Sequence, residues 1–149
     1  MNVVLAHPQG FELEDVVLEE AKKNANRYGG EFQVVNDMKE AFNGADLVYP
    51  KAWSPKSYFP PHSGSLDKAG ATAYQDKFKD WICTQEMMDL TNKAKYLHCG
   101  PADRGQEVTD DVIDNKHYSL YFEQAEDRLH VQKAVMAMVM GGREVKRRK

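Results

Sequence analysis

Short apolar runs alternate with amphipathic stretches along the first third of the chain. The β-branched run at residues 2–6 ends in a His-Pro-Gln-Gly turn and predicts a buried strand. Between residues 12 and 28 the apolar residues recur at helical spacing until Gly29 and Gly30 supply a stop, which predicts a helix. Residues 32–35 predict a second strand, and this order of strand, helix and strand indicates a parallel sheet.

The same alternation continues to the end of the chain, with residues 66–78 ambiguous between a loop and a weak helix. The further predicted elements are a helix capped by Asn36 or Asp37 that runs to Phe42, strand 46–49, helix 85–90 capped by Thr84, strand 95–99, helix 110–113 capped by Thr109, strand 118–122 and helix 123–140, ended by Gly141 and Gly142. We therefore expect an α/β fold: a three-layer, Rossmann-like sandwich with a mostly parallel sheet of about five strands.

The fourth predicted strand ends in a histidine and a cysteine. Gly100 and Pro101 follow and prevent a helix or a strand ladder from continuing. His98 and Cys99 therefore lie at the carboxyl end of the predicted strand 95–99. Ligands bind at this edge of open α/β sheets, which makes the imidazole and the thiol candidates for chemistry. Each residue taken singly also fits a structural role, because free cysteine is commonly buried and a lone histidine near a core is often a hydrogen-bonded structural residue.

Composition and charge narrow the class of protein. With 149 residues, 42% of them hydrophobic and 29% charged, the chain fits one globular domain at residues 1–142, followed by a basic tail at 143–149. The net charge of -3 argues against a general binder of nucleic acid or of anionic membranes. No run is long and apolar enough to cross a membrane, no signal-peptide pattern precedes residue 20, and no glycine-rich nucleotide-binding motif follows the first strand.

The two cysteines, Cys83 and Cys99, are not in a CxxC spacing. This arrangement suggests neither a disulfide framework nor a zinc site. We therefore expect a cytoplasmic protein in a reducing compartment, without a bound metal.

Several ordered blocks resemble the ornithine and aspartate carbamoyltransferase family, in its C-terminal, amino-acid-binding domain. Residues 98–101, His-Cys-Gly-Pro, are similar to the family's His-Cys-Leu-Pro signature, and residues 107–114 are similar to the segment that follows it. Residues 126–134 resemble the family's final helix, Glu-Asn-Arg-x-x-x-Gln-Lys-Ala, and residues 5–10 and 45–49 match as well. The resemblance covers nearly the whole chain.

The resemblance implies carbamoyl transfer, in which an amine attacks the carbonyl carbon of carbamoyl phosphate and phosphate leaves. By this resemblance Arg128, near the start of the last helix, would contact the carbamoyl oxygen. One such donor at a developing oxyanion is worth roughly 3 to 4 kcal/mol. His98 would share this oxygen or steady the leaving group, and Cys99, Gly100 and Pro101 would line the amine pocket. The implied partners are carbamoyl phosphate and an amino-acid substrate, and no metal or organic cofactor is implied.

Two departures from the family pattern bear on the substrate. Lys51 stands where ornithine enzymes carry an aspartate, which reverses the charge preference of that position. The Lys-x-Trp-Ser loop formed with Trp53 and Ser54 is similar instead to the knotted carbamoyltransferases that use acylated ornithines, where a cation can meet the carboxylate. A solvated lysine on a loop remains the alternative. The second departure, Gly100 for leucine, would loosen the turn that helps hold the reacting amine.

Two features of full-length family members do not occur in the sequence. No Ser-Thr-Arg-Thr motif of the carbamoyl-phosphate domain is present, and the family's first strand and helix before residue 2 are also lacking. That strand lies at the centre of a Rossmann-type sheet, so two ladder faces would stay unpaired unless a missing N-terminal domain or self-association completes the sheet.

Three functional hypotheses follow from these observations. The first is the amino-acid-binding portion of a carbamoyltransferase, inactive as an isolated chain. The second is a non-catalytic, truncated module that binds an amino-acid-like ligand or a partner chain. The third treats His98 and Cys99 as a hydrolase pair, although the spacing supplies no third, orienting residue.

Overall fold

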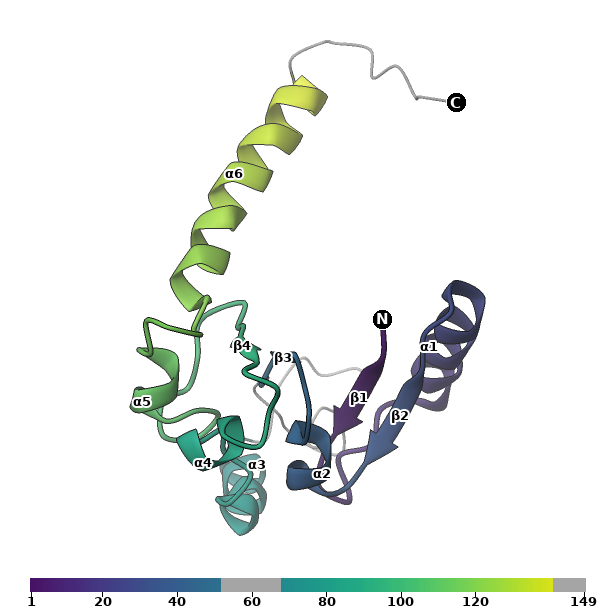
Figure 1. Cartoon of the computed structure of the whole chain (residues 1–149), viewed down its shortest axis with the longest axis vertical. Coiled ribbons are helices and arrows are strands. Elements are labelled where there is room, and N and C mark those ends of the chain that lie inside the picture. Colours follow the sequence, from purple (N-terminus) through teal and green to yellow (C-terminus); the bar gives the residue numbers. More distant parts are fainter. Residues whose placement is uncertain (52–67, 141–149) are drawn as a thin grey trace.

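The structure, a computed structural model, describes residues 1–51 and 68–140 (Figure 1). It is a mixed α/β fold. Its elements are β1 Val3–Ala6, α1 Asp15–Tyr28, β2 Phe32–Val35, α2 Met38–Phe42, β3 Leu47–Val48, α3 Lys68–Gln75, the 3₁₀ helix η2 Asp76–Phe78, α4 Gln85–Met88, β4 Lys95–Tyr96, α5 Asp110–Ile113 and α6 Tyr121–Met140. The predicted tail at 143–149 and the loop residues 52–67 lie outside the described residues.

The described strands form two separate parallel pairs. β1 pairs with β2 from Val3 opposite Phe32 to Ala6 opposite Val35, and β3 pairs with β4 through Leu47 and Val48. Parallel pairing is therefore confirmed, but the continuous sheet of about five strands is not. The reason is that no ladder joins β1 to β3 among the described residues, so each pair keeps one edge facing the other pair.

The predicted fifth strand at residues 118–122 is wrong. Only Ser119 forms a parallel bridge, opposite Tyr96, and helix α6 already begins at Tyr121. The Tyr96 amide donates to the Tyr118 carbonyl and the Leu120 amide donates to the Tyr96 carbonyl, but the next amide in the chain turns into the helix. The aromatic residues that suggested a strand are thus the first turn of α6, and only one residue adds to the β3–β4 pair.

Two of the predicted helix caps are confirmed by their hydrogen bonds. The Asp37 carboxylate accepts from the Lys39 and Glu40 amides, and the Thr84 hydroxyl accepts from the Met87 amide. Thr109 holds the cap position of α5, but its hydroxyl donates to the Cys83 carbonyl instead of capping the helix. That bond ties the start of α5 to the segment before α4.

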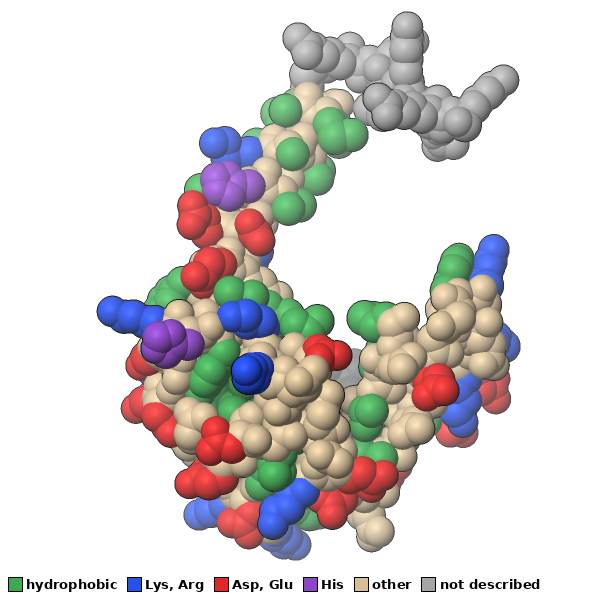
Figure 2. All heavy atoms as spheres, in the orientation of Figure 1, with side chains coloured by type: hydrophobic (Ala, Val, Ile, Leu, Met, Phe, Trp, Pro, Cys, Tyr) green, Lys and Arg blue, Asp and Glu red, His purple; other side chains and the backbone are tan. Residues whose placement is uncertain are grey.

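The apolar core belongs to one side of the molecule. Its buried members are Phe42, Val48, Cys83, Met88, Ala94, Tyr96, Val108, Val112 and Ile113, which come from α2, β3, α4, β4, α5 and the loops between them. Helices α1 and α6 bury no residue, and α6 projects away from the other elements with apolar side chains on its surface (Figures 1 and 2). None of the described helices combines the length and apolar character of a membrane span.

Candidate functional site

Strand β4 delivers His98 to a fully buried position at its carboxyl end. The Gly100 amide donates to Nδ1 of His98 at 2.9 Å, so this nitrogen is the acceptor and the ring proton lies on Nε2. Nε2 lies 3.2 Å from Oε2 of Glu107, although the two groups are not aligned for a hydrogen bond. The imidazole is therefore held in one orientation, with its proton turned toward a buried carboxylate.

Glu107 is the functional candidate that sequence reasoning missed. Its side chain is 1% exposed, and its Oε2 accepts from the Asp103 amide at 2.7 Å. The second oxygen, Oε1, has no hydrogen-bond partner among the described residues, and leaving such an acceptor unmet costs about 1 to 3 kcal/mol or more for a charged group. The sequence offered one signal, the position of Glu107 inside a block that resembles the carbamoyltransferases, but no periodicity marks it as buried.

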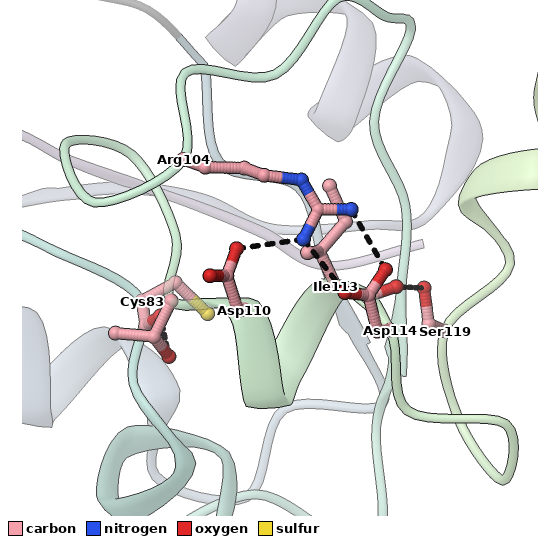
Figure 3. A network of polar contacts seen from close by, with 7 residues as sticks. Cys83, Arg104, Asp110, Ile113, Asp114 and Ser119 are labelled. Carbon is pink, nitrogen blue, oxygen red and sulfur yellow. Dashed lines mark hydrogen bonds and ion pairs between the residues drawn. The ribbon is translucent and has the colours of Figure 1, made fainter.

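The segment that carries Glu107 is clamped from outside by Arg104 (Figure 3). The guanidinium donates to both carboxylate oxygens of Asp114 and to Oδ1 of Asp110, each at 2.7 Å. These hydrogen bonds lower the pKa of Asp114, because they favour its charged form. Arg104 precedes Glu107 in the chain, and Asp110 and Asp114 follow it. These ion pairs therefore join the loop after β4 to helix α5 across the segment that carries Glu107.

A second anchor for this segment comes from Cys83. The Cys83 amide donates to the Glu107 carbonyl at 2.9 Å, and the Thr109 amide donates to the Cys83 carbonyl at 3.0 Å. Burial raises the pKa of the Cys83 thiol to about 12 and keeps it protonated at neutral pH. Cys83 is therefore a structural residue beside the site.

Aromatic rings close the site around His98. The Tyr49 ring stacks on the imidazole with centroids 6.3 Å apart, and the Tyr121 ring lies 6.1 Å away at the start of α6. Gly100 has a φ of 66° and sits so close to Tyr121 that an added Cβ would lie 3.4 Å from the phenol oxygen. Glycine fits here because this left-handed backbone conformation is strained for other residues.

A cavity of about 570 Å³ opens between the β1 and β3 sides of the molecule. Its walls are mostly apolar, and the charged or imidazole side chains among its lining residues are Glu107, His7 and Lys51. His7 is 8% exposed, and its Nε2 has no hydrogen-bond partner among the described residues. A mostly apolar cavity of this size, lined by two residues that each carry a buried, unpartnered polar atom, matches the usual make-up of a small-molecule site.

The structure brings some of the predicted site residues together and leaves others apart. His98, Cys99, Gly100 and Pro101 follow β4 in one loop, with Cys99 partly buried, and Lys51 reaches the cavity that Glu107 lines. Trp53 and Ser54 lie outside the described residues.

Arg128 is exposed on α6, seven residues and about 10 Å of helix beyond Tyr121, and no described contact links it to His98. Its role stays a prediction. Within residues 1–51 and 68–140, no cluster of three or more histidine, cysteine or acidic side chains is placed to hold a metal ion.

Comparison with known sequences places these features in a family context. Residues 1–139 match the family described as aspartate/ornithine carbamoyltransferase, Asp/Orn binding domain. The ornithine carbamoyltransferase of Thermococcus kodakarensis is 40% identical over 148 residues, which cover 97% of this chain and 43% of that protein. The putative carbamoyltransferase YgeW of Escherichia coli is 40% identical over 141 residues, covering 83% of this chain and 36% of that protein. The chain thus spans about two fifths of the length of these relatives.

Solved structures show the same similarity. A crystal structure of acetylornithine transcarbamylase complexed with acetylcitrulline superposes with a TM-score of 0.79 and 34% identity, over 92% of this chain and 39% of that one. A mutant N-acetyl-L-ornithine transcarbamylase complexed with carbamyl phosphate and N-succinyl-L-norvaline gives a TM-score of 0.79 and 34% identity, over 92% and 40% of the two chains.

Proposed function

Because the chain belongs to the aspartate/ornithine carbamoyltransferase family and matches its Asp/Orn-binding domain, we propose that it is the amino-acid-binding portion of a carbamoyltransferase. The complete enzyme transfers a carbamoyl group from carbamoyl phosphate to the side-chain amine of an ornithine-like substrate. One observation carries the proposal: Glu107, whose carboxylate oxygen Oε1 is buried without a hydrogen-bond partner among the described residues, is one of the residues that line a cavity of about 570 Å³.

The chemistry of a reacting amine matches this oxygen. A neutral amine attacks through its lone pair, and the nitrogen must lose a proton as the new C–N bond forms. Oε1 of Glu107 accepts an N–H from the amine and thereby orients the lone pair away from the carboxylate. Nε2 of His98 lies 3.2 Å from the other oxygen, Oε2, without an aligned hydrogen bond, so we assign His98 a positioning role beside Glu107.

Lys51 supports recognition of the other end of the substrate. Lys51 is exposed and lines the same cavity as Glu107, so its positive charge attracts an α-carboxylate bound there. An N-acylated amino acid carries no α-ammonium group to be repelled by Lys51, which favours acylated ornithines over free ornithine. We assign Trp53 and Ser54 to the same end of the substrate, Cys99, Gly100 and Pro101 to the amine pocket, and Arg128 to the carbamoyl oxygen, all by resemblance to the family.

A binding experiment tests the role of Glu107. The chain is titrated calorimetrically with N-acetylornithine and with N-acetylnorvaline, which has no side-chain amine. Glu107→Gln is expected to weaken N-acetylornithine roughly tenfold or more, since a charge-assisted hydrogen bond contributes about 1.5 to 3 kcal/mol, and to change N-acetylnorvaline little. Glu126→Gln, on exposed α6, is the matched control. Equal losses for both ligands would refute amine recognition by Glu107.

The role of Lys51 is tested by comparing the binding of N-acetylornithine with that of free ornithine. Lys51→Asp is expected to weaken N-acetylornithine more than free ornithine, because only the free amino acid gains an attraction from the new carboxylate. Equal losses would show that Lys51 is a solvated surface charge.

An activity measurement on the isolated chain distinguishes two possibilities: that the chain is part of a carbamoyltransferase, and that it is a complete enzyme. The described cavity offers Lys51 and His7 but no cluster of donors for a phosphate dianion, so we expect no ureido product from carbamoyl phosphate and ornithine derivatives. Turnover that Arg128→Ala abolishes would contradict this proposal. Amino-acid binding without turnover, even when a carbamoyl-phosphate domain is added, would favour the non-catalytic module.

A further inference from the structure

Tyr49 connects the end of strand β3 with both His98 and helix α6. Its ring stacks on the imidazole of His98, with centroids 6.3 Å apart and planes inclined by 23°. Its hydroxyl accepts a hydrogen bond from Nε2 of Gln124 at 3.2 Å, across 75 positions of the chain. One side chain therefore contacts the segment after β4 and the first turn of α6 at the same time.

Tyr121 completes a circuit of contacts around His98. Its ring lies 6.1 Å from the imidazole, with the planes inclined by 46°. Tyr121 and Gln124 are three residues apart on α6, so their side chains lie on the same face of the helix. This face of α6 is therefore turned toward His98 and Tyr49.

The hydrogen bond between Tyr49 and Gln124 bears on the direction of α6. The helix buries none of its residues and projects away from the other elements (Figure 1). Gln124 is only partly exposed, and its Oε1 is buried without a hydrogen-bond partner among the described residues. Removal of the Tyr49 hydroxyl would thus leave both ends of the Gln124 amide unpartnered, and the loss of one neutral hydrogen bond shifts an equilibrium roughly two- to tenfold.

The same face of α6 leads to Arg128. Arg128 follows Gln124 by four residues, so the two side chains lie on one face, about 6 Å apart along the helix axis. Any rotation or tilt of α6 that moves Gln124 moves Arg128 as well. Tyr49 also precedes Lys51 by only two residues, which brings the support of α6 close to the residue that we assign to the substrate's carboxylate.

We propose that Tyr49 is a positioning residue that fixes the direction of α6 relative to His98 through two separable contacts. The hydroxyl holds Gln124, and with it the face of α6 that carries Arg128, while the ring holds the imidazole of His98. The meaning for Arg128 rests on the proposed function. The link among Tyr49, His98 and Gln124 does not.

The first test measures the direction of α6 in the intact chain. Nitroxide labels are attached through Lys39→Cys on α2 and Lys133→Cys on α6, both at exposed positions. Cys99→Ser removes the partly exposed native thiol, and Cys83 is buried and stays unlabelled. Double electron–electron resonance then gives the distribution of distances between the two labels.

Two variants remove the same hydrogen bond from its two ends. We expect one narrow distance distribution in the labelled parent and its loss in both Tyr49→Phe and Gln124→Met. The double variant is expected to be no broader than either single one, because the bond can be lost only once. Tyr28→Phe is the matched control, since it removes a hydroxyl from an exposed tyrosine at the end of α1, and it should keep the parent distribution.

The second test separates the ring of Tyr49 from its hydroxyl. NMR detects the carbon-bound ring protons of His98, which feel the ring current of a stacked aromatic side chain. Tyr49→Phe keeps the ring, so we expect these signals to stay in place although α6 loses its fixed direction. Tyr49→Leu removes both contacts and should shift the His98 signals as well. A merely structural role for Tyr49 would move both readouts in both variants.

Three outcomes would overturn the inference. They are a broad distribution in the labelled parent, a parent-like distribution in Tyr49→Phe, and an equal broadening in Tyr28→Phe. Circular dichroism verifies that each variant is folded before it is compared. None of these measurements uses a substrate, so failure here leaves the proposed function untouched. Conversely, a chain that fails to bind N-acetylornithine could still show the link through Tyr49.

Discussion

The two sides of the molecule differ in how they use apolar residues. On the side of β3, β4, α4 and α5, the apolar positions meet in one buried core. In the β1–β2 pair and helices α1 and α6, none of the side chains is fully buried. Val112 of α5 is fully buried whereas Val16 of α1 is 66% exposed, although both lie at apolar positions of predicted helices.

This difference shows that an amphipathic pattern predicts which face of a helix is apolar, but not whether another element packs against that face. Helix α5 packs against α4, and its Val112 and Ile113 share the buried core with Tyr96 of β4. Helix α1 contacts mainly β2, which pairs only with β1 among the described strands. Hydrophobic stabilisation scales with the area removed from water, at about 25 cal/mol per Å². The described contacts therefore stabilise the β3–β4 side more than the β1–β2 side.

The largest expected difference is in the reactivity of the two thiols. With the Cys83 pKa raised to about 12, its thiolate fraction at neutral pH falls roughly a thousandfold below that of free cysteine. We expect Ellman's reagent to label partly exposed Cys99 rapidly and Cys83 at least roughly a thousandfold more slowly, until denaturant exposes both. Cys99→Ser should remove the fast phase alone. Equal rates in the native chain would mean that the core around Cys83 is not formed.

A matched pair of methionine substitutions sharpens the comparison in energetic terms. Met88 is 5% exposed in α4, and Met136 is 56% exposed in α6. Met88→Ala is expected to lower the free energy of unfolding by about 2 to 5 kcal/mol, and Met136→Ala to change it by no more than about 0.5 kcal/mol. Urea titration of the two variants measures both values. A comparable loss in Met136→Ala would show that α6 is packed in solution.

The smallest expected effect concerns the clamp that joins the site loop to α5. Hydrogen bonds from Arg104 lower the pKa of Asp114 in the folded chain, so the unfolded chain binds that proton more readily. The stabilisation is present above the ordinary aspartate pKa of about 3.9 and is lost as pH falls through the lowered value. We therefore expect Asp114→Asn to lower the melting temperature slightly at neutral pH, with a difference that shrinks in acid.

The control for the clamp is Asp127→Asn on exposed α6. It is expected to leave the melting temperature nearly unchanged at every pH. A pH-independent loss in Asp114→Asn would mean that the substitution acts through helix α5 itself and not through the ion pair with Arg104.

The outcome of sequence reasoning depended on how local each feature is. The caps at Asp37 and Thr84 and the turn at Gly100 are set within a few residues, and the structure confirms the two caps by their hydrogen bonds. The run at residues 118–122 was misassigned because aromatic residues suit both a strand and a helix start, and the choice depends on the single bridge to Tyr96.

Local sequence patterns predict neither the burial of Glu107 nor the division of the sheet into two pairs, and the reasons differ. Burial of Glu107 depends on the Asp103 amide and on His98, which the turn after β4 brings together in space. The open ladder faces were anticipated only through the resemblance to a larger family, since no local signal in residues 2–6 or 46–49 reports whether a strand has one neighbour or two.

The stability of this chain would depend on mass action if another strand paired with the open inner edges of β1 and β3. A segment that pairs with the folded state but not with the unfolded one adds roughly 2.7 kcal/mol when its free concentration is a hundred times its dissociation constant. A melting temperature measured on the chain alone then gives a lower limit, and the value rises with the logarithm of the segment's concentration. Residues 1–149 would in this sense have a stability set by the supply of a partner as much as by their own sequence.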